Sequence, residues 1–167
     1  MNILIVLLRL IHIVAAVVWV GAGATQLFIL APALAAAGET GLRFSKVLGS
    51  VPAFRMLFPV ASGITMLAGI LLYLTGSASH FSQTGNIVLG IGALAGIAAG
   101  IHGGAVTNRS SAKLGDLINR YVTDGGAIAA EGVTAIREEA MRQATHVRVS
   151  FVLMVIALIG MGSARYL

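Results

Sequence analysis

The chain has 167 residues, of which 57% are hydrophobic and only 10% are charged. A soluble domain carries about a quarter charged residues, so this composition predicts a membrane protein, with residues 1–167 as a single domain. The absence of cysteine excludes disulfides, thiolate metal sites and iron–sulfur clusters. The net charge of +5 does not indicate nucleic-acid binding, because the basic residues flank apolar segments, where they set membrane topology.

Four apolar segments follow one another along the chain, each close to or above the roughly 20 residues that a membrane-spanning helix needs. They cover residues 3–34, 56–74, 87–106 and 147–166. Pro32 is expected to end or kink the first segment, and Ser50 with Pro52 has the pattern of a cap and first-turn proline that open a helix. The sequence therefore predicts an all-α polytopic membrane protein, built as a four-helix transmembrane bundle.

The distribution of charge sets the expected orientation. The connection between the second and third segments, "TGSASHFSQTGN", contains no Lys, Arg, Asp or Glu, whereas all six acidic residues and most of the basic ones lie in the other two connections. By the positive-inside rule those two connections are cytoplasmic and both termini lie outside. We expect a multi-pass protein of the bacterial inner (plasma) membrane, surrounded by the lipid bilayer.

The third connection, residues 107–146, is too long for a simple turn. "AKLGDLINRYV" has the spacing of an amphipathic helix, "DGG" at residues 124–126 interrupts it, and a second apolar stripe leads into the fourth segment. That stripe consists of Val133, Ile136, Ala140, Met141 and Ala144. The pattern predicts an amphipathic cytoplasmic helical hairpin between the third and fourth helices, which either caps the bundle or binds a partner.

Glycine recurs at every fourth residue of the third segment, at Gly92, Gly96, Gly100 and Gly104. Small residues at this spacing let another backbone approach closely, and close packing drives helix association in lipid. The ridge predicts a seam with a neighbouring helix. Room for a flat ligand and a homodimer seam are the alternatives.

Polar side chains interrupt the first segment. Arg9, His12 and Trp19 share one helix face, and because polar groups are costly in lipid this face is expected to point into the bundle and to line any cofactor site there. At about 1.5 Å of rise per residue, three side chains of the other segments fall in the same outer third of the membrane. They are Met66, Met161 and Arg165.

These residues suit two ligands. Haem b would take His12 as an axial ligand, with Arg9 and Arg165 on its propionates. A copper(I) ion would take His12 with the thioethers of Met66 and Met161. Two arginines assist a haem and do nothing for a cation, so haem b is favoured over copper. In the further alternative no cofactor is bound, and these side chains only pack or anchor the helices.

A second pair of histidines lies near the cytoplasmic side. His102 and His146 are expected to approach the same surface, where they would share a metal or titrate as a pair; the alternative is that both are interfacial polar residues. The sequence contains no paired membrane carboxylates, no phosphate-binding glycine loop and no Ser/His/Asp arrangement. It therefore does not decide whether the protein is an enzyme.

The stretch "LIHIVAAVVWVGAGATQLFILAPAL", with His12, Trp19, Gly21 and Gly23, and the closing "MGSARYL" resemble small bacterial four-helix membrane proteins. These are the copper-resistance D (CopD)-like group and, more distantly, the protoporphyrinogen oxidase of the HemJ type. The first resemblance implies copper handling in the inner membrane, and the second implies haem b on a first-helix histidine, here His12. The third segment has no lysine, which is a departure from the HemJ pattern.

The functional expectation has two forms. The first is an integral inner-membrane protein that binds haem b or a copper ion through His12 and has a redox or metal-handling role. The second is a cofactor-free membrane scaffold, or a partner-binding protein that uses its cytoplasmic hairpin.

Overall fold

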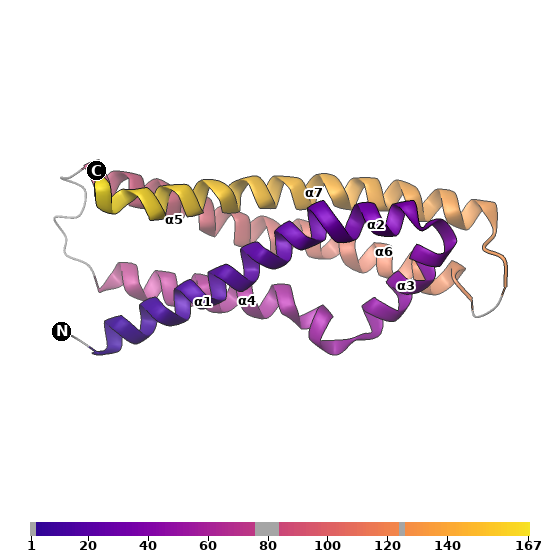
Figure 1. Cartoon of the computed structure of the whole chain (residues 1–167), viewed down its shortest axis with the longest axis horizontal. Coiled ribbons are helices and arrows are strands. Elements are labelled where there is room, and N and C mark those ends of the chain that lie inside the picture. The colour runs from indigo at the N-terminus through magenta and orange to yellow at the C-terminus, as the bar shows by residue number, and fades with distance from the viewer. Residues whose placement is uncertain (1–2, 76–83, 124–125) are drawn as a thin grey trace.

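The computed structural model describes residues 3–75, 84–123 and 126–167. These residues form helices and short connections without a strand, and four helical stretches are long and apolar enough to cross a membrane. They are Ile3–Ala36, Pro52–Leu74, Thr84–Tyr121 and Ala130–Tyr166. The predicted all-α class and its four apolar helices are confirmed. Figure 1 shows an elongated molecule with both chain ends at one end, called here the termini end; the opposite end, which holds α3 and the turn between α6 and α7, is the hairpin end.

The first stretch consists of α1 (Ile3–Thr25), a π-helical turn η1 (Gln26–Leu30) and α2 (Ala31–Ala36). Pro32 lies in the first turn of α2. A proline has no N–H for the carbonyl four residues earlier, and its ring crowds that carbonyl. The wider turn just before it, in which the Ala31 N–H bonds to the Gln26 carbonyl, accommodates the ring. The helix therefore continues through Pro32 with a local widening and does not end there.

The second stretch is preceded by α3 (Gly38–Ser50) and is itself α4 (Pro52–Leu74). Pro52 opens α4, as predicted. The predicted cap at Ser50 is wrong: Val51 holds the capping position, without a side-chain hydrogen bond, and Ser50 is the last residue of α3. The Ser50 hydroxyl donates to the Val47 carbonyl within its own helix, α3.

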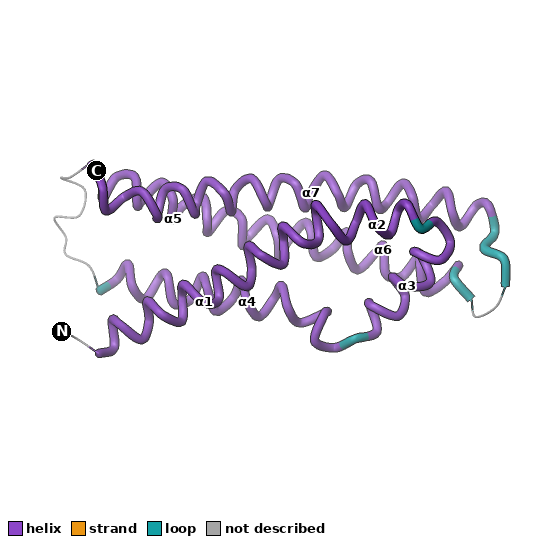
Figure 2. The backbone as a smooth tube through the Cα atoms, in the orientation of Figure 1, coloured by secondary structure: helices purple, strands orange, loops and turns teal. Residues whose placement is uncertain are grey.

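The third and fourth stretches are longer than the apolar segments that predicted them. α5 (Thr84–His102), a second π-helical turn η3 (Gly103–Thr107) and α6 (Asn108–Tyr121) form one continuous helical run, so the predicted amphipathic helix extends the third helix. α7 (Ala130–Ser163) ends in a short 3₁₀ turn, η4 (Ala164–Tyr166). Its 34 residues correspond to about 51 Å, well beyond the hydrocarbon thickness of about 30 Å. Figure 2 shows how little of the described chain is non-helical.

The long helices pack as two pairs, α1 along α4 and α5 along α7. α1 starts beside α4 and crosses toward α7 as it approaches α2 (Figure 1). The pairs meet in a buried cluster to which each long helix contributes one residue. Its members are Trp19, Ala61, Ala99 and Met154.

The glycine ridge of α5 contacts α7 most closely at Gly92. A Cβ atom on Gly92 would lie 2.9 Å from the backbone nitrogen of Met161, and one on Gly160 would lie 2.9 Å from the Cα atom of Gly92. Both distances are shorter than real Cβ atoms make, so neither glycine can be enlarged without separating the two helices. The predicted seam with a neighbouring helix is confirmed here.

The other three glycines of the ridge have different surroundings. Gly96 also faces α7, where its Cβ position is in ordinary contact with the Ala157 side chain. Gly100 faces α4, because a Cβ there would overlap the Met66 sulfur. Gly104 has no atom within 4 Å of its Cβ position, so the expected seam is wrong at that residue. A homodimer through this ridge stays a prediction.

The hairpin end has a small core of its own, formed by α3, α6 and the first turns of α7. Its buried members are Ile118, Val122, Ile128 and Ile136. Arg43 and Lys46 of α3 donate to backbone carbonyls at and just after the end of α6, at distances of 2.7 Å to Thr123 and 2.7 Å to Val122. These cations satisfy carbonyls left without helical partners, at the end where the helix dipole favours positive charge. The apolar face of the predicted hairpin is therefore covered within the chain.

The apolar stripe predicted for the start of α7 is only partly correct. Ile136 is 2% exposed, as expected, whereas Met141 is 57% exposed. The side chain that follows Ile136 into the contact with α6 is Glu139, which is 4% exposed. The sequence pattern missed this position because a carboxylate at a buried helix position is unusual unless it is paired.

Candidate functional site

The first candidate site lies between α1 and α4, where His12 contacts the α4 backbone. The Nδ1 atom of His12 is 2.8 Å from the Thr65 carbonyl oxygen. Gly69, one turn further along α4, makes room for the ring, because a Cβ atom there would lie 2.8 Å from Cε1 of His12. The Thr65 hydroxyl donates to the Ala61 carbonyl within α4.

This hydrogen bond fixes the protonation pattern of the imidazole. A carbonyl oxygen can only accept, so Nδ1 must carry the proton, and in the neutral ring Nε2 keeps its lone pair. Metal-binding histidines commonly have this arrangement, in which one ring nitrogen donates to a backbone carbonyl and the other faces the metal. His12 is therefore oriented and protonated as a ligand through Nε2 would be.

The other residues of the predicted stripe differ in burial. Trp19 is 7% exposed in the central cluster, and Gly23 is buried against Met154 and Phe151 of α7. Arg9 is exposed. The stripe therefore points into the bundle at Trp19 and Gly23, is half-buried at His12, and reaches the periphery at Arg9.

The remaining predicted ligands have other neighbours. The Met66 sulfur packs against Gly100 of α5, and the methyl group of Met161 lies near Gly96 of the same helix. The guanidinium of Arg165 is exposed and lies 5.1 Å from the centre of the Tyr166 ring, in a cation–π contact. Both thioethers are thus used in packing around α5, whereas the His12 ring faces α4.

The second candidate site is the histidine pair at the α5–α7 contact. The ring centres of His102 and His146 are 5.7 Å apart, with the planes tilted by 56°. Nδ1 of His102 lies 2.9 Å from the Ser150 hydroxyl, and the Thr107 hydroxyl lies 3.2 Å from the same oxygen. The structure brings the predicted pair together and adds two hydroxyl groups that the sequence reasoning missed.

Polar side chains continue from this pair along the α7 face toward the hairpin end. Gln143 donates to the Ser111 hydroxyl at 2.8 Å, and Glu139 accepts from the Ser110 hydroxyl at 2.7 Å. The α7 members of the line are Glu139, Gln143, His146 and Ser150. Their spacing of four, three and four residues is that of one helix face, and this was the signal available in the sequence.

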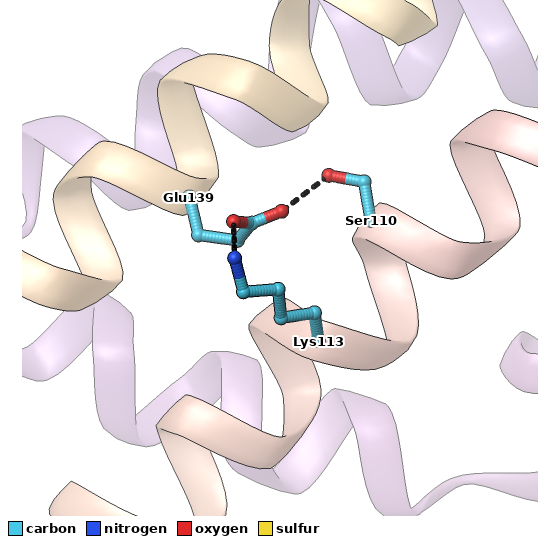
Figure 3. A network of polar contacts seen from close by, with 3 residues as sticks. All are labelled: Ser110, Lys113 and Glu139. Atoms are coloured by element: carbon cyan, nitrogen blue, oxygen red, sulfur yellow. Dashed lines mark hydrogen bonds and ion pairs between the residues drawn. The ribbon is translucent and has the colours of Figure 1, made fainter.

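Glu139 contributes a carboxylate to this line, and both of its oxygens are bound. Its second oxygen lies 2.9 Å from the Lys113 ammonium, so that Lys113 and Ser110 hold both oxygens (Figure 3). The hydrogen bonds from Lys113 and Ser110 lower the pKa of Glu139 below its ordinary value. Glu139 lies eight residues before the apolar segment 147–166, so this network belongs to the hairpin end.

Gln26 is a further polar group that the sequence reasoning did not single out. Its side-chain oxygen is buried and has no hydrogen-bond partner among the residues that the structure describes. It opens the π-helical turn η1, one turn beyond Gly23 on the face that packs against α7. Such widened turns are common at functional sites, and η3 provides a second one beside His102.

The donor set can be compared with the requirements of metal sites. Within the described ranges, no three or more His, Cys, Asp and Glu side chains gather as a metal-binding group.

Comparison of the chain with models of protein families, with curated proteins and with solved structures finds no match. The class that the fold defines is an all-α protein with four helices apolar and long enough to cross a membrane.

Proposed function

We propose that this chain is an integral membrane protein that binds haem b through Nε2 of His12 and has a redox role. The observation that carries the proposal is the hydrogen bond from His12 Nδ1 to the Thr65 carbonyl. It leaves Nε2 with the lone pair that haem iron requires of an axial histidine. A bound haem would supply one-electron chemistry, and His12 would hold and orient its iron.

An open apolar groove lies beside the His12–Thr65 contact. It has a volume of about 600 Å³ between α1 and α4, which is within the usual size range of small-molecule sites. Its lining residues are all apolar and include Ile11 and Ile64, the chain neighbours of His12 and Thr65, whereas His12 itself does not line it. Arg9, one turn before His12, is exposed and suited to a propionate.

Copper is the weaker form of the same proposal. A copper(I) site would need the thioethers of Met66 and Met161 beside His12. These thioethers pack against Gly100 and near Gly96, on the side of α4 and α7 that faces α5. Copper binding at His12 would therefore require both thioethers to leave their contacts with α5.

The proposed location is the bacterial inner membrane, with both termini outside. The support is the distribution of charge, because nine of the eleven basic residues lie between residues 43 and 55 or between residues 109 and 148, on α3, the start of α4, α6 and α7. Arg9 and Arg165 are the two that belong to the termini end. The positive-inside rule then assigns the hairpin end to the cytoplasm.

A cofactor-free scaffold is the second candidate function. The observation that favours it is the separate core of α3, α6 and α7 at the hairpin end, which gives the molecule a folded projection beyond its apolar helices. Such a projection suits contact with a protein partner.

One preparation separates these functions. The protein is purified from cells grown with iron and copper, and its absorbance spectrum and metal content are measured. Haem b gives a Soret band that shifts on reduction, and copper(I) gives a colourless protein with stoichiometric copper. A colourless, metal-free protein would leave the scaffold as the supported function and His12 as a packing residue.

A further inference from the structure

A second groove lies between η1 and the part of α7 that starts near its middle, at Arg148. It has a volume of about 400 Å³. Phe28 and Phe151 form its aromatic part, packed edge to face with ring centres 5.3 Å apart, and Val152, Val155 and Ile156 continue its wall along α7. Among the residues that line it, Arg148 is the only one with a charge.

Arg148 is available for a ligand. Its side chain is exposed, and within the described residues it makes no hydrogen bond or ion pair. The side chains one turn earlier on α7, Ala144 and Thr145, carry no negative charge that would neutralise it. An arginine in this position pairs well with a phosphate, because its guanidinium donates two parallel hydrogen bonds.

The groove has a charged end and an apolar wall, like the headgroup and acyl chain of an amphiphile. Arg148 is the second residue of the apolar segment 147–166, and the wall from Arg148 to Ile156 extends about 12 Å in the direction of the membrane interior. The charged group therefore lies at the boundary of the apolar segment, and the aromatic and aliphatic wall follows beneath it. A phospholipid has the same order, with its phosphate at the surface and its acyl chain below.

The charges nearby favour a lipid with net negative charge. None of the described residues that line the groove carries a carboxylate to offset Arg148, and the carboxylate of Glu139, nine residues earlier on α7, is buried and held by Lys113. Basic sites between helices at a membrane surface bind anionic headgroups for this reason. We propose that this groove binds an anionic phospholipid, with the phosphate on Arg148 and one acyl chain along Phe28, Phe151 and Ile156. This site does not depend on haem at His12.

The test compares two lipids with identical acyl chains, phosphatidylglycerol and phosphatidylcholine, on the purified full chain in detergent, by native mass spectrometry or a titration. Wild type is expected to bind phosphatidylglycerol at least about fivefold more tightly, since one arginine contributes about that factor. Arg148→Gln should remove the preference. Arg137→Gln, at an exposed arginine of α7 outside the groove, should keep it.

Two further measurements test whether the acyl chain occupies the groove and whether a phosphate without an acyl chain binds there. Val152→Trp fills the groove and should weaken both lipids, because the acyl chain loses its place. Glycerol 3-phosphate at the same concentration should not compete, since it has no chain. Equal affinity of wild type for the two lipids, a preference retained in Arg148→Gln, or full competition by glycerol 3-phosphate would each overturn the proposal and leave only a non-selective lipid contact or a simple anion site.

Discussion

The Nδ1 atom of His12 donates a hydrogen bond to the carbonyl oxygen of Thr65 at 2.8 Å, and this contact joins α1 to α4. It determines that Nδ1 carries the proton of the neutral ring, so that Nε2 keeps the lone pair with which it could bind a metal. The same contact restricts the rotation of the ring, because the space for it exists only where Gly69 has no side chain. Most of the functional proposal rests on this relationship.

Gly69→Ala should disturb His12 without removing it. The new Cβ atom would lie 2.8 Å from Cε1 and 3.0 Å from Nδ1, so the ring must move away from Thr65. We expect a loss of haem content and a lower thermal unfolding temperature, with an energetic cost of about 1–3 kcal/mol for overpacking. Haem content is measured by the pyridine haemochrome method, and unfolding by a thermal scan in detergent.

Gly63→Ala is the matched control for Gly69→Ala, because no atom lies within 4 Å of its Cβ position on the same helix. It should keep both haem and stability. A Gly69→Ala protein with the haem content of wild type would show that the position of the His12 ring does not control the cofactor.

The seam between α5 and α7 gives a second matched pair. Gly92→Ala should destabilise the protein by about 1–3 kcal/mol, because its Cβ would lie 2.9 Å from the Met161 nitrogen and backbone atoms cannot move aside cheaply. Gly104→Ala, where nothing lies within 4 Å, should be neutral or slightly stabilising, since alanine favours helix more than glycine does. Thermal scans of the two variants compare the positions; equal unfolding temperatures would contradict the close α5–α7 contact.

Glu139 should make stability depend on pH at the hairpin end. Its pKa is lowered in the folded protein, so it contributes stability above its ordinary value of 4.5, and this contribution is lost as the pH falls through the lowered pKa. Glu139→Gln should reduce the free energy of unfolding at pH 7 by up to about 1 kcal/mol, because the charge that faces Lys113 is lost and the exposed Lys113 is screened by solvent. The Gln side-chain oxygen can still accept the hydrogen bond from Ser110.

Urea or thermal unfolding between pH 7 and pH 3 measures this effect. The difference between wild type and Glu139→Gln should narrow as the pH falls, and Glu138→Gln, at the exposed neighbouring carboxylate, should follow wild type throughout. A difference that is constant over this range would mean that the charge of Glu139 does not matter to folding.

The proposed orientation can be tested with two single-cysteine variants, Thr75→Cys and Asn119→Cys. Both residues are exposed, and they lie toward opposite ends of the molecule, at the end of α4 and in α6. Because the natural chain has no cysteine, each variant reports one position. A membrane-impermeant maleimide added to intact cells without their outer membrane should label Thr75→Cys alone. Labelling of Asn119→Cys alone would reverse the orientation, and labelling of both would contradict the four-span arrangement.

The sequence predicted the helices better than their ends. The apolar segments were long enough to identify four helices, but apolar length does not show where a helix starts or stops. The stripe that begins at Val133 predicted that the fourth helix extends before residue 147, and α7 begins at Ala130. Pro32 was expected to end or kink the first segment, and the helix continues through it after a π-helical turn, as far as Ala36. Whether a proline ends a helix depends on the preceding turn, and the residue types do not reveal that turn.

The candidate site was predictable to a similar degree. A polar face on an apolar helix predicted that His12 points into the bundle, and the structure finds it half-buried. The positions of His102 near the end of the third segment and His146 at the start of the fourth predicted that the two approach each other, as they do. Depth alone could not show that Met66 faces α5, because the helix rotation that decides this depends on the packing of Gly100. The Thr65 carbonyl could not be predicted either, since every residue has one and only the fold selects it.

The most direct test of the proposed function is the haem content of four purified proteins: wild type, His12→Ala, His12→Gly and His146→Ala. Each is expressed with iron and a haem precursor, and haem per chain is measured by the pyridine haemochrome method. We predict about one haem per chain in wild type and in His146→Ala, and almost none in His12→Ala, with partial recovery of His12→Gly by added imidazole. Wild-type protein without haem, or equal haem in wild type and His12→Ala, would contradict the account.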